Sequence, residues 1–567
     1  MSKSIPSEHD GHNPQRRLIT LLISEKKDLG IILGYGVCSG IFALIIPVAV
    51  QTLVNTIAFG SLLQPILVLT LLVLLILGLS AFLRGLQVYL MEKVQQRIFA
   101  RTSLTLAHHI PKVKMSAIEG EQGPELINRF FDILTVQKST ALIMIDGLSI
   151  FLQTLVGMAL LAFYHPILLA FDLFLVGLIF TVVFYLGKGA IQTSIIESKK
   201  KYEVANWLEI LSRFPLVFKK TQAEEFIFEK SDLITSHYIK GRTKHFRILL
   251  RQIIGALSLQ VFASSALLSL GGWLVVKRQL TLGQLVAAEL IVTSVVTGVG
   301  KFGKYLESYY DLIAAADKLG DLLDLPTESS RDIVQALSPK FPSQPAALSV
   351  VNLSYAPNQD QFKLSQVSAK VNPGEKVIIY GGRSSGKSTL CDLLYLLKEP
   401  QSGCIELDGI SHKDMSLSHF RSQVSLLRGA DLFDGTLLEN LCIHQKTASL
   451  DDIYKILDQL GILEEMKQLP NGLMTNIVGG RSSLSATQAK LIALARTLLA
   501  RPRLLLLDAF LDDLDDDSKL SALKIILEQT ASTVVLTTGS KTLSKTAKIA
   551  WTLDSGHLIM QQSGGSS

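Results

Sequence analysis

The first half of the chain carries six long apolar stretches, and they restrict the fold more than any other feature. A helix needs about 20 consecutive apolar residues to cross a bilayer. Because lipid offers the backbone no hydrogen-bond partner, only helices and closed barrels can span it. Buried helices of a large soluble core are the alternative, which six such runs in one half disfavour. The sequence predicts transmembrane helices near residues 28–52, 62–88, 140–163, 166–187, 248–274 and 282–305.

Basic residues predict the orientation of these spans. Arg16 and Arg17 precede the first span, and the connections at 92–138 and 188–251 are long and basic. Since positive loops stay in the cytoplasm, we expect a cytoplasmic N-terminus, and an even number of spans returns the second half to the cytoplasm. Residues 1–13 are polar and lack the apolar region of a cleaved signal peptide.

Net charge and cysteines add two exclusions. The net charge of +6 comes largely from these loops, so we expect no nucleic-acid partner. The four cysteines form no C-x-x-C pair, and three lie in the expected cytoplasmic half, where thiols stay reduced. We therefore expect no disulfide and no metal site built on cysteine.

The second half has the pattern of an α/β domain. A stretch rich in Pro, Ser and charge precedes it, and short β-rich runs such as 348–351 then alternate with helical segments. The sequence predicts a cytoplasmic N-terminal segment, a transmembrane domain, a linker, a nucleotide-binding domain and a disordered tail. Their ranges are 1–27, 28–318, 319–345, 346–560 and 561–567.

A phosphate-binding loop stands near the start of the α/β domain. Residues 381–388 fit G-x-x-x-x-G-K-[ST], between a strand-like run at 376–380 and a helical run at 388–394. In that setting backbone N–H groups cradle phosphates, the Lys reaches the terminal phosphates and the Ser hydroxyl reaches Mg²⁺. A second apolar strand ends in Asp508, which is suited to the same Mg²⁺. We predict ATP and Mg²⁺ as ligands, with Ser388 and Asp508 as metal ligands. The other predicted nucleotide-binding residues here are Gly381, Gly382, Arg383, Ser384, Ser385, Gly386, Lys387 and Thr389.

The order of these features resembles an ABC transporter of the exporter type, in half-transporter form. Residues 403–409 resemble the family's G-x-I-x-x-D-G turn, and Leu484–Gln488 stands where the family has L-S-G-G-Q. The resemblance implies a multi-domain fold, with an all-α six-helix transmembrane domain followed by an α/β P-loop NTPase domain. It implies that Tyr355 stacks on adenine. It also implies a homodimer, or a heterodimer with another half-transporter, in which Ser485 and Gln488 contact the ATP of the opposite subunit.

The departures from the family pattern fall on hydrolysis. Arg428 aligns with the glutamine of the Q-loop, Ala509 with the catalytic glutamate, and Gly539 with the switch histidine. Ala486 and Thr487 replace the two signature glycines. A positioned general base contributes about 10²–10⁴ in rate, so we predict no catalytic residue and impaired or absent hydrolysis, while the phosphate-binding residues are intact.

Carboxylates elsewhere have open interpretations. Asp172 and Glu289 lie in spans, where carboxylates are costly and often functional, although pairing between helices would also explain them. In the acidic run at 512–517 only Asp515 has a role by resemblance, and the remaining carboxylates are predicted to form a solvated face.

The leading interpretation is an ATP-binding half-transporter subunit in the bacterial inner membrane, with an unidentified substrate. A regulatory or scaffold membrane protein that uses ATP to set a dimer state is one alternative. An active exporter ATPase, or the heterodimer partner of a competent subunit, is another. ATPase activity, measured alone and with a partner subunit, would separate these.

Overall fold

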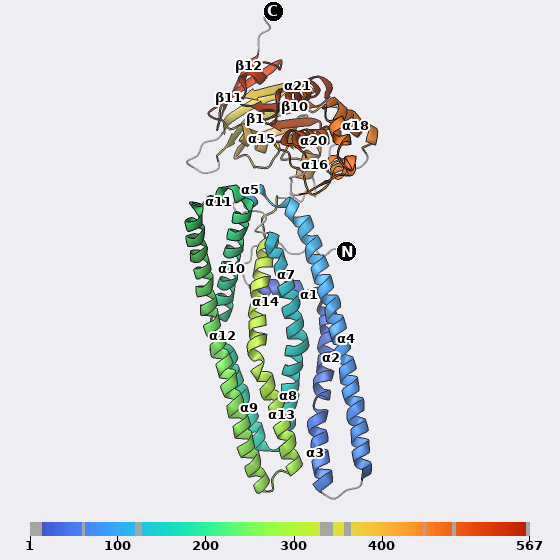
Figure 1. The fold of residues 1–567 in the computed structure, drawn as a ribbon, viewed down its shortest axis with the longest axis vertical. Helices are drawn as coiled ribbons and strands as arrows, with labels where there is room; N and C mark the ends of the chain where they lie inside the picture. The colour runs from blue at the N-terminus through green and yellow to red at the C-terminus, as the bar shows by residue number, and fades with distance from the viewer. Residues whose placement is uncertain are drawn as a thin grey trace, which may run out of the picture. The chain divides into compact units, whose positions relative to one another are not determined.

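The computed structural model describes residues 14–58, 63–119, 127–328, 344–356, 364–445, 448–478 and 484–562. The chain divides into two compact units. The N-terminal unit comprises residues 1–113 and 117–326, and the C-terminal unit comprises 114–116 and 327–567. Figure 1 shows long helices in the first and strands with shorter helices in the second.

Among the described residues up to 326, all the elements of secondary structure are helices. The helices are α1 Pro14–Ile23, α2 Lys26–Phe42, α3 Ile45–Ala58, α4 Leu63–His109, α5 Met115–Glu119, α7 Asp132–Leu142, α8 Leu148–Tyr164, α9 Pro166–Phe180, α10 Ala190–Arg213, α11 Pro215–Phe218, α12 Ala223–Val276, α13 Leu282–Gly300 and α14 Phe302–Leu323. Short 3₁₀ or π turns link several of them, as at Ile143–Gly147 and Thr181–Tyr185.

The predicted spans fall on these helices. Five helical stretches among the described residues are long and apolar enough to cross a membrane, and the first five predicted spans overlap them. The sixth predicted span falls on α13, whose apolar part, Leu282–Val295, is shorter. The expected helical transmembrane domain is confirmed.

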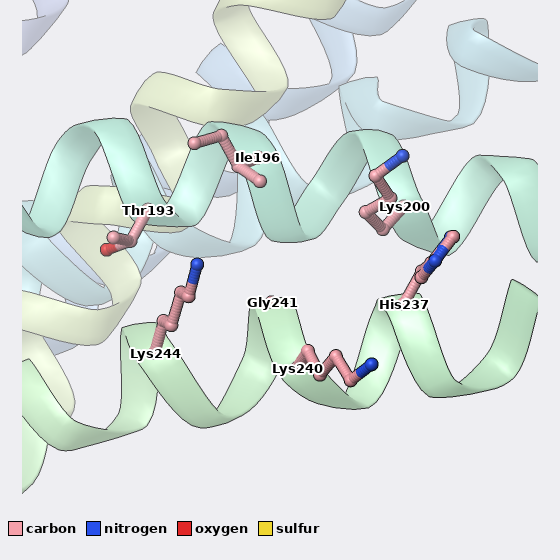
Figure 2. A pocket seen from close by; sticks show the side chains of 7 residues that line it. All are labelled: Thr193, Ile196, Lys200, His237, Lys240, Gly241 and Lys244. Atoms are coloured by element: carbon pink, nitrogen blue, oxygen red, sulfur yellow. The ribbon is translucent and has the colours of Figure 1, made fainter.

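Several helices are much longer than a bilayer is thick. At 1.5 Å per residue, the 54 residues of α12 extend about 80 Å, against a hydrocarbon core of about 30 Å. Beyond its apolar part α12 packs along α10, where Arg242 pairs with Glu197 at 3.2 Å. A shallow pocket of about 300 Å³ lies between these two extensions, and Lys200, Lys240 and Lys244 line it with His237 (Figure 2).

The last helix of the N-terminal unit, α14, is anchored by the buried amino group of Lys318. This nitrogen donates to the carbonyl of Ser198 at 3.1 Å, lies 3.7 Å from a carboxylate oxygen of Asp132 and sits 3.6 Å from the Tyr202 ring centroid. The helix continues to Leu323, inside the range expected as linker, because Leu319 and Leu322 on its last turns are buried.

The C-terminal unit is built on two main sheets. A six-stranded sheet has the order β12-β11-β3-β10-β9-β6, parallel except for the edge strand β12, and a four-stranded antiparallel sheet has the order β2-β1-β4-β5. The strands are β1 Leu348–Tyr355, β2 Leu364–Val371, β3 Lys376–Tyr380, β4 Ser402–Leu407, β5 Ile410–Ser411, β6 Val424–Leu427, β7 Gly435–Thr436, β8 Asn476–Ile477, β9 Leu504–Asp508, β10 Thr533–Thr538, β11 Ile549–Asp554 and β12 His557–Gln562. The helices are α15 Lys387–Leu394, α16 Leu417–Gln423, α17 Leu437–Cys442, α18 Leu450–Gln459, α19 Leu463–Lys467, α20 Ala486–Leu499, α21 Asp516–Lys524 and α22 Lys541–Ser544.

The parallel strands are apolar along their whole length because both faces of the sheet are covered. All residues of β9 are buried, and its side chains divide between two hydrophobic clusters. Leu505 and Leu507 belong to one, with α20, whereas Leu504 and Leu506 belong to the other, with α15 and the four-stranded sheet. This rigid core fixes where the strands end, and the predicted α/β domain is confirmed.

Candidate nucleotide-binding site

The site is assembled where four parallel strands end. Leu427 of β6 pairs with Leu507 of β9, so Arg428 and Asp508 follow side by side. On the other side of β9, Asp508 pairs with Thr537 of β10, which in turn lies beside β3. Ligands of parallel α/β sheets bind at the carboxyl ends of the strands, and the phosphate loop leaves β3 at this same edge.

The loop between β3 and α15 has a backbone that two residues hold in the left-handed region. Gly386 has a φ of +103°, which glycine adopts without a Cβ penalty, and Ser384 has a φ of +62°. At the loop's start Gly381 is tightly enclosed, since a Cβ there would lie 2.5 Å from Ser385 Oγ and 2.6 Å from the carbonyl oxygen of Leu553. The sequence therefore specifies the conformation of this loop.

Lys387 crosses this loop. Its ammonium donates to the carbonyl oxygens of Gly381 and Gly382, at 2.7 Å each, and lies 3.4 Å from Ser385 Oγ. As the first residue of α15, it stands at a helix N-terminus, where unpaired N–H groups and the helix dipole favour an anion. The arrangement can therefore hold a phosphate chain.

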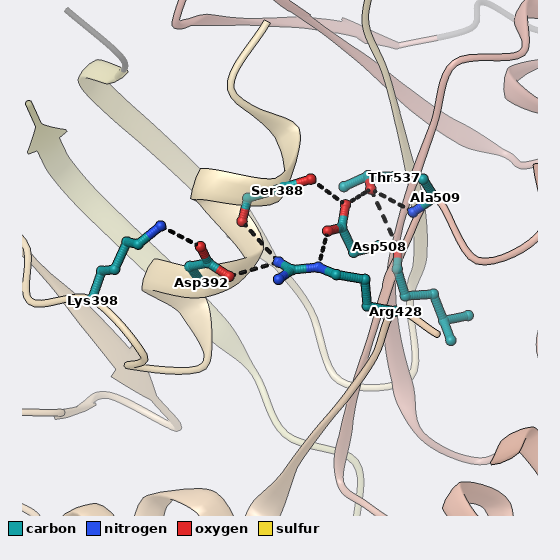
Figure 3. A network of polar contacts seen from close by, with 8 residues as sticks. Ser388, Asp392, Lys398, Arg428, Asp508, Ala509 and Thr537 are labelled. Carbon is teal, nitrogen blue, oxygen red and sulfur yellow. Dashed lines mark hydrogen bonds and ion pairs between the residues drawn. The ribbon is translucent and has the colours of Figure 1, made fainter. Parts of the chain in front are cut away.

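Asp508 is the buried centre of the site. It is 2% exposed, and its Oδ1 accepts from Ser388 Oγ at 3.1 Å and from Thr537 Oγ1 at 2.9 Å. Its Oδ2 accepts from Arg428 Nε at 2.5 Å (Figure 3). The structure thus brings together the two residues predicted to bind Mg²⁺, and adds a cation to them.

Arg428 bridges two carboxylates. Besides Asp508 it pairs with Asp392 of α15, through Nη2 at 2.6 Å, and Asp392 also pairs with Lys398 at 2.8 Å. Burial disfavours the charge of Arg428, but hydrogen bonds to Asp392 and Asp508 outweigh it and raise the pKa of the guanidinium. A divalent cation added at Asp508 would face this fixed positive charge. The residues present therefore do not fit the Mg²⁺ site that the resemblance implies.

Ala509 and Gly539 stand at the positions that the resemblance aligns with the catalytic glutamate and the switch histidine. Ala509 has a φ of +50°, and its N–H is held by Thr537, whose carbonyl and hydroxyl oxygens both lie at 3.1 Å. The N–H of Gly539 donates to Asp512 Oδ2 at 2.8 Å, and Thr538 donates to Asp512 Oδ1. Asp512, expected on a solvated face, is half-buried, and its carboxylate also binds the end of β10.

The remaining predicted residues are spread over the C-terminal unit. Ser485 caps α20, since its hydroxyl accepts from the N–H of Gln488 at 3.1 Å, and Gln488 Oε1 accepts from the N–H of Ser485 at 2.7 Å. Tyr355 ends β1 and is half-buried, and it packs against the hydrophobic cluster that the four-stranded sheet shares with α15. Arg383 is exposed on the loop and Thr389 is buried in α15. The roles of these residues stay predictions.

Sequence reasoning missed two members of the site. Asp392 stands four residues after Ser388, so both occupy one face of α15, which a helical reading of 388–394 could have shown. Thr537 carries no local signal. Its place opposite Asp508 depends on which strands pair, and a single sequence does not reveal that.

Comparisons with known proteins agree with the order of these two domains. A family model described as the ABC transporter transmembrane region matches residues 29–299, and one described as ABC transporter matches residues 364–510. A lactococcin-A transport/processing ATP-binding protein of Lactococcus lactis is 27% identical over 77% of this chain, and the match covers 61% of that relative's length. An ATP-dependent lipid A-core flippase of Desulfotalea psychrophila is 24% identical over 81% of this chain and 80% of its own length.

A solved structure has the same fold. A bacterial Atm1-family ABC exporter with ATP bound superposes with a TM-score of 0.81 at 17% identity, over 97% of this chain and 95% of that chain. At this identity the likeness shows the fold alone.

Proposed function

Because the chain belongs to the ABC transporter family, with the exporter-type order of membrane domain and nucleotide-binding domain, we propose that it is a half-transporter subunit that binds ATP. Three retained features support this: the specified loop, Lys387 at the N-terminus of α15, and Ser388 beside Asp508. The ion pair of Arg428 with Asp508 opposes the Mg²⁺ ligation that the sequence predicted for Ser388 and Asp508.

The proposal includes very slow or absent hydrolysis, and the observation that carries it is Ala509. A methyl group follows Asp508 at the end of β9, where a carboxylate would orient and deprotonate water. Gly539 supplies no side chain either, and its backbone is bound by Asp512. A positioned base contributes about 10²–10⁴ in rate, so losses of this kind leave ATP mainly as a ligand.

ATP binding without hydrolysis can still shift a conformational equilibrium, provided that one state binds ATP more tightly. That shift does not reset itself, so a homodimer of this kind would not cycle as a pump. We propose that the subunit works in a dimer, either with itself as a nucleotide-set regulator or with a second half-transporter that supplies turnover. The named relatives carry different cargoes, so the proposal names no substrate.

The chain is an integral membrane protein, and we propose that it lies in a bacterial inner membrane with the nucleotide-binding domain in the cytoplasm. The support is charge placement. The extensions of α10 and α12 beyond their apolar parts are basic, and Lys200, Lys240 and Lys244 line one pocket there (Figure 2). Positive charge next to spans marks the cytoplasmic side.

Binding is tested by measuring ATP affinity of the purified full-length protein and of Lys387→Ala. We expect the variant to bind at least about tenfold more weakly, a difference of roughly 1.4 kcal/mol, because the ammonium at the helix N-terminus is lost. Equal affinities, or no binding by either protein, would contradict the proposal.

Hydrolysis is tested by steady-state phosphate release, from the chain alone and together with a competent half-transporter subunit. We expect turnover by the chain alone to fall far below the typical enzyme range of about 1–10³ per second. Turnover inside that range, abolished by Lys387→Ala, would show an active ATPase instead. Ala509→Glu should restore little activity, because Arg428 and Gly539 remain.

A further inference from the structure

The side chains around Asp508 form a charge-balanced group that already contains its own cation. Two carboxylates, Asp392 and Asp508, meet two cations, Arg428 and Lys398, through contacts of 2.5–2.8 Å. Asp392 and Asp508 are 8% and 2% exposed as side chains, whereas that of Arg428 is 45% exposed. The carboxylates are thus enclosed, and the partly exposed guanidinium lies between the two of them (Figure 3).

The backbone places these residues side by side. Arg428 and Asp508 each follow a residue of the β6–β9 pair, Leu427 and Leu507, so the register places them next to one another. Asp392 faces the same point because it lies one helical turn beyond Ser388 on α15.

The guanidinium keeps donors for a ligand. Nε donates to Asp508, and Nη2 donates to Asp392 and to the carbonyl oxygen of Ser388 at 3.3 Å. Nη1 makes no hydrogen bond to any residue that the structure describes. Arginine suits phosphate because its guanidinium stays charged, and here the two N–H bonds of Nη1 can donate to it.

A divalent cation would meet unfavourable conditions at the same place. Both oxygens of Asp508 accept hydrogen bonds, from Ser388, Thr537 and Arg428. Mg²⁺ would have to displace Arg428 from Asp508 or bind with a positive charge as its neighbour. The like charges repel, and the low-dielectric surroundings of a buried carboxylate strengthen that repulsion.

We propose that this chain binds its nucleoside triphosphate without a divalent cation, with Arg428 supplying the fixed positive charge opposite the phosphates. The inference rests on the proposed ATP binding and concerns the same site. The arginine that stands where the resemblance implies glutamine is then an added ligand-binding group. This role agrees with a site that holds ATP and does not cleave it.

The test measures ATP affinity of the full-length protein in excess EDTA and in excess MgCl₂, for the wild type and for Arg428→Gln. Wild-type affinity should differ by less than about threefold between the two conditions. Arg428→Gln should bind at least about tenfold more weakly in EDTA, and MgCl₂ should restore its affinity. Mn²⁺ electron paramagnetic resonance should show protein-bound metal with ATP for the variant only.

Arg421→Gln is the matched control. Arg421 also forms a two-bonded ion pair in this unit, with Glu328 at 2.6 and 2.8 Å, and its loss should leave affinity in EDTA unchanged. If Arg428→Gln does not fold, Arg428→Lys takes its place. It keeps a positive charge and should retain binding in EDTA, so loss of that binding would overturn the inference.

Other results would overturn the inference in distinguishable ways. If the wild type requires MgCl₂, the proposed function stands and the inference fails. If Arg428→Gln binds as well as the wild type in EDTA, or more tightly in both conditions, Arg428 does not hold phosphate. If no variant binds ATP in either condition, the proposed function fails too.

Discussion

Thr537 should stabilise the C-terminal unit mainly through one hydrogen bond to a buried carboxylate. It is 1% exposed, and its hydroxyl donates to Asp508 Oδ1 at 2.9 Å. The other two contacts of this hydroxyl contribute less, since the Leu507 carbonyl oxygen lies 3.5 Å away and the N–H of Ala509 also bonds the Thr537 carbonyl at 3.1 Å. Thr537→Val keeps the shape and removes a hydrogen bond to a charged group, which contributes about 1.5–3 kcal/mol.

Thr497→Val is the matched control. Thr497 is also buried, but its hydroxyl donates to the carbonyl of Ala493, four residues earlier in α20, at 2.8 Å. That carbonyl keeps its helical N–H partner in the variant, so the expected loss is below about 1 kcal/mol. The comparison therefore isolates the charge of the acceptor from the loss of a buried hydroxyl.

Urea unfolding followed by tryptophan fluorescence measures both variants. Of the three tryptophans only Trp551, in β11, lies in the C-terminal unit, so a background with Trp207→Phe and Trp273→Phe reports that unit alone. With an m-value of about 3 kcal/mol/M, Thr537→Val should lower the midpoint by about 0.5–1 M. Equal midpoint shifts for the two variants would refute the reasoning, because Asp508 would then not depend on this hydroxyl.

Three further predictions follow from single positions. Gly381→Ala should weaken ATP binding by about tenfold or more, because the added Cβ would lie 2.6 Å from the Leu553 carbonyl oxygen. A Cβ added at Gly382 meets nothing within 4 Å, so Gly382→Ala should bind ATP as the wild type does. Equal ATP affinities of the two variants would contradict this. Burial lowers the pKa of Lys318 from 10.5 to about 7. Between these two pH values the unfolded chain binds one more proton than the folded chain, so the free energy of unfolding rises with pH, by up to about 1.4 kcal/mol per pH unit. Thermal unfolding at several pH values should show a smaller slope for Lys318→Met, and an unchanged slope would refute the assignment. Asp172→Asn should have a melting temperature no lower than that of the wild type. Both carboxylate oxygens of this intramembrane residue are buried without a hydrogen-bond partner among the described residues. A lower melting temperature would reveal a partner for the carboxylate.

The local sequence determined the parts of the molecule whose physics is local. Apolar runs of bilayer length predicted the spans, and the helices of the structure overlap them. The strand at 376–380, the loop and the helix that starts at Lys387 follow from β-branched residues, glycine spacing and helix formers in consecutive positions. The run of four leucines that ends at Asp508 is a strand because it is short and apolar and both faces of its sheet are covered.

The tertiary structure decided what lies next to these elements. Arg428 and Asp508 are 80 residues apart in the chain, and Arg428 and Asp392 are 36 apart, so their contact depends on parallel strand pairing that no local pattern encodes. The same holds for Thr537 and for Asp512, whose neighbours in sequence suggested a solvated face. The resemblance predicted that arginine stands where the family has glutamine, but only the pairing of β6 with β9 placed that arginine against Asp508, because charge acts over distance in space and not along the chain.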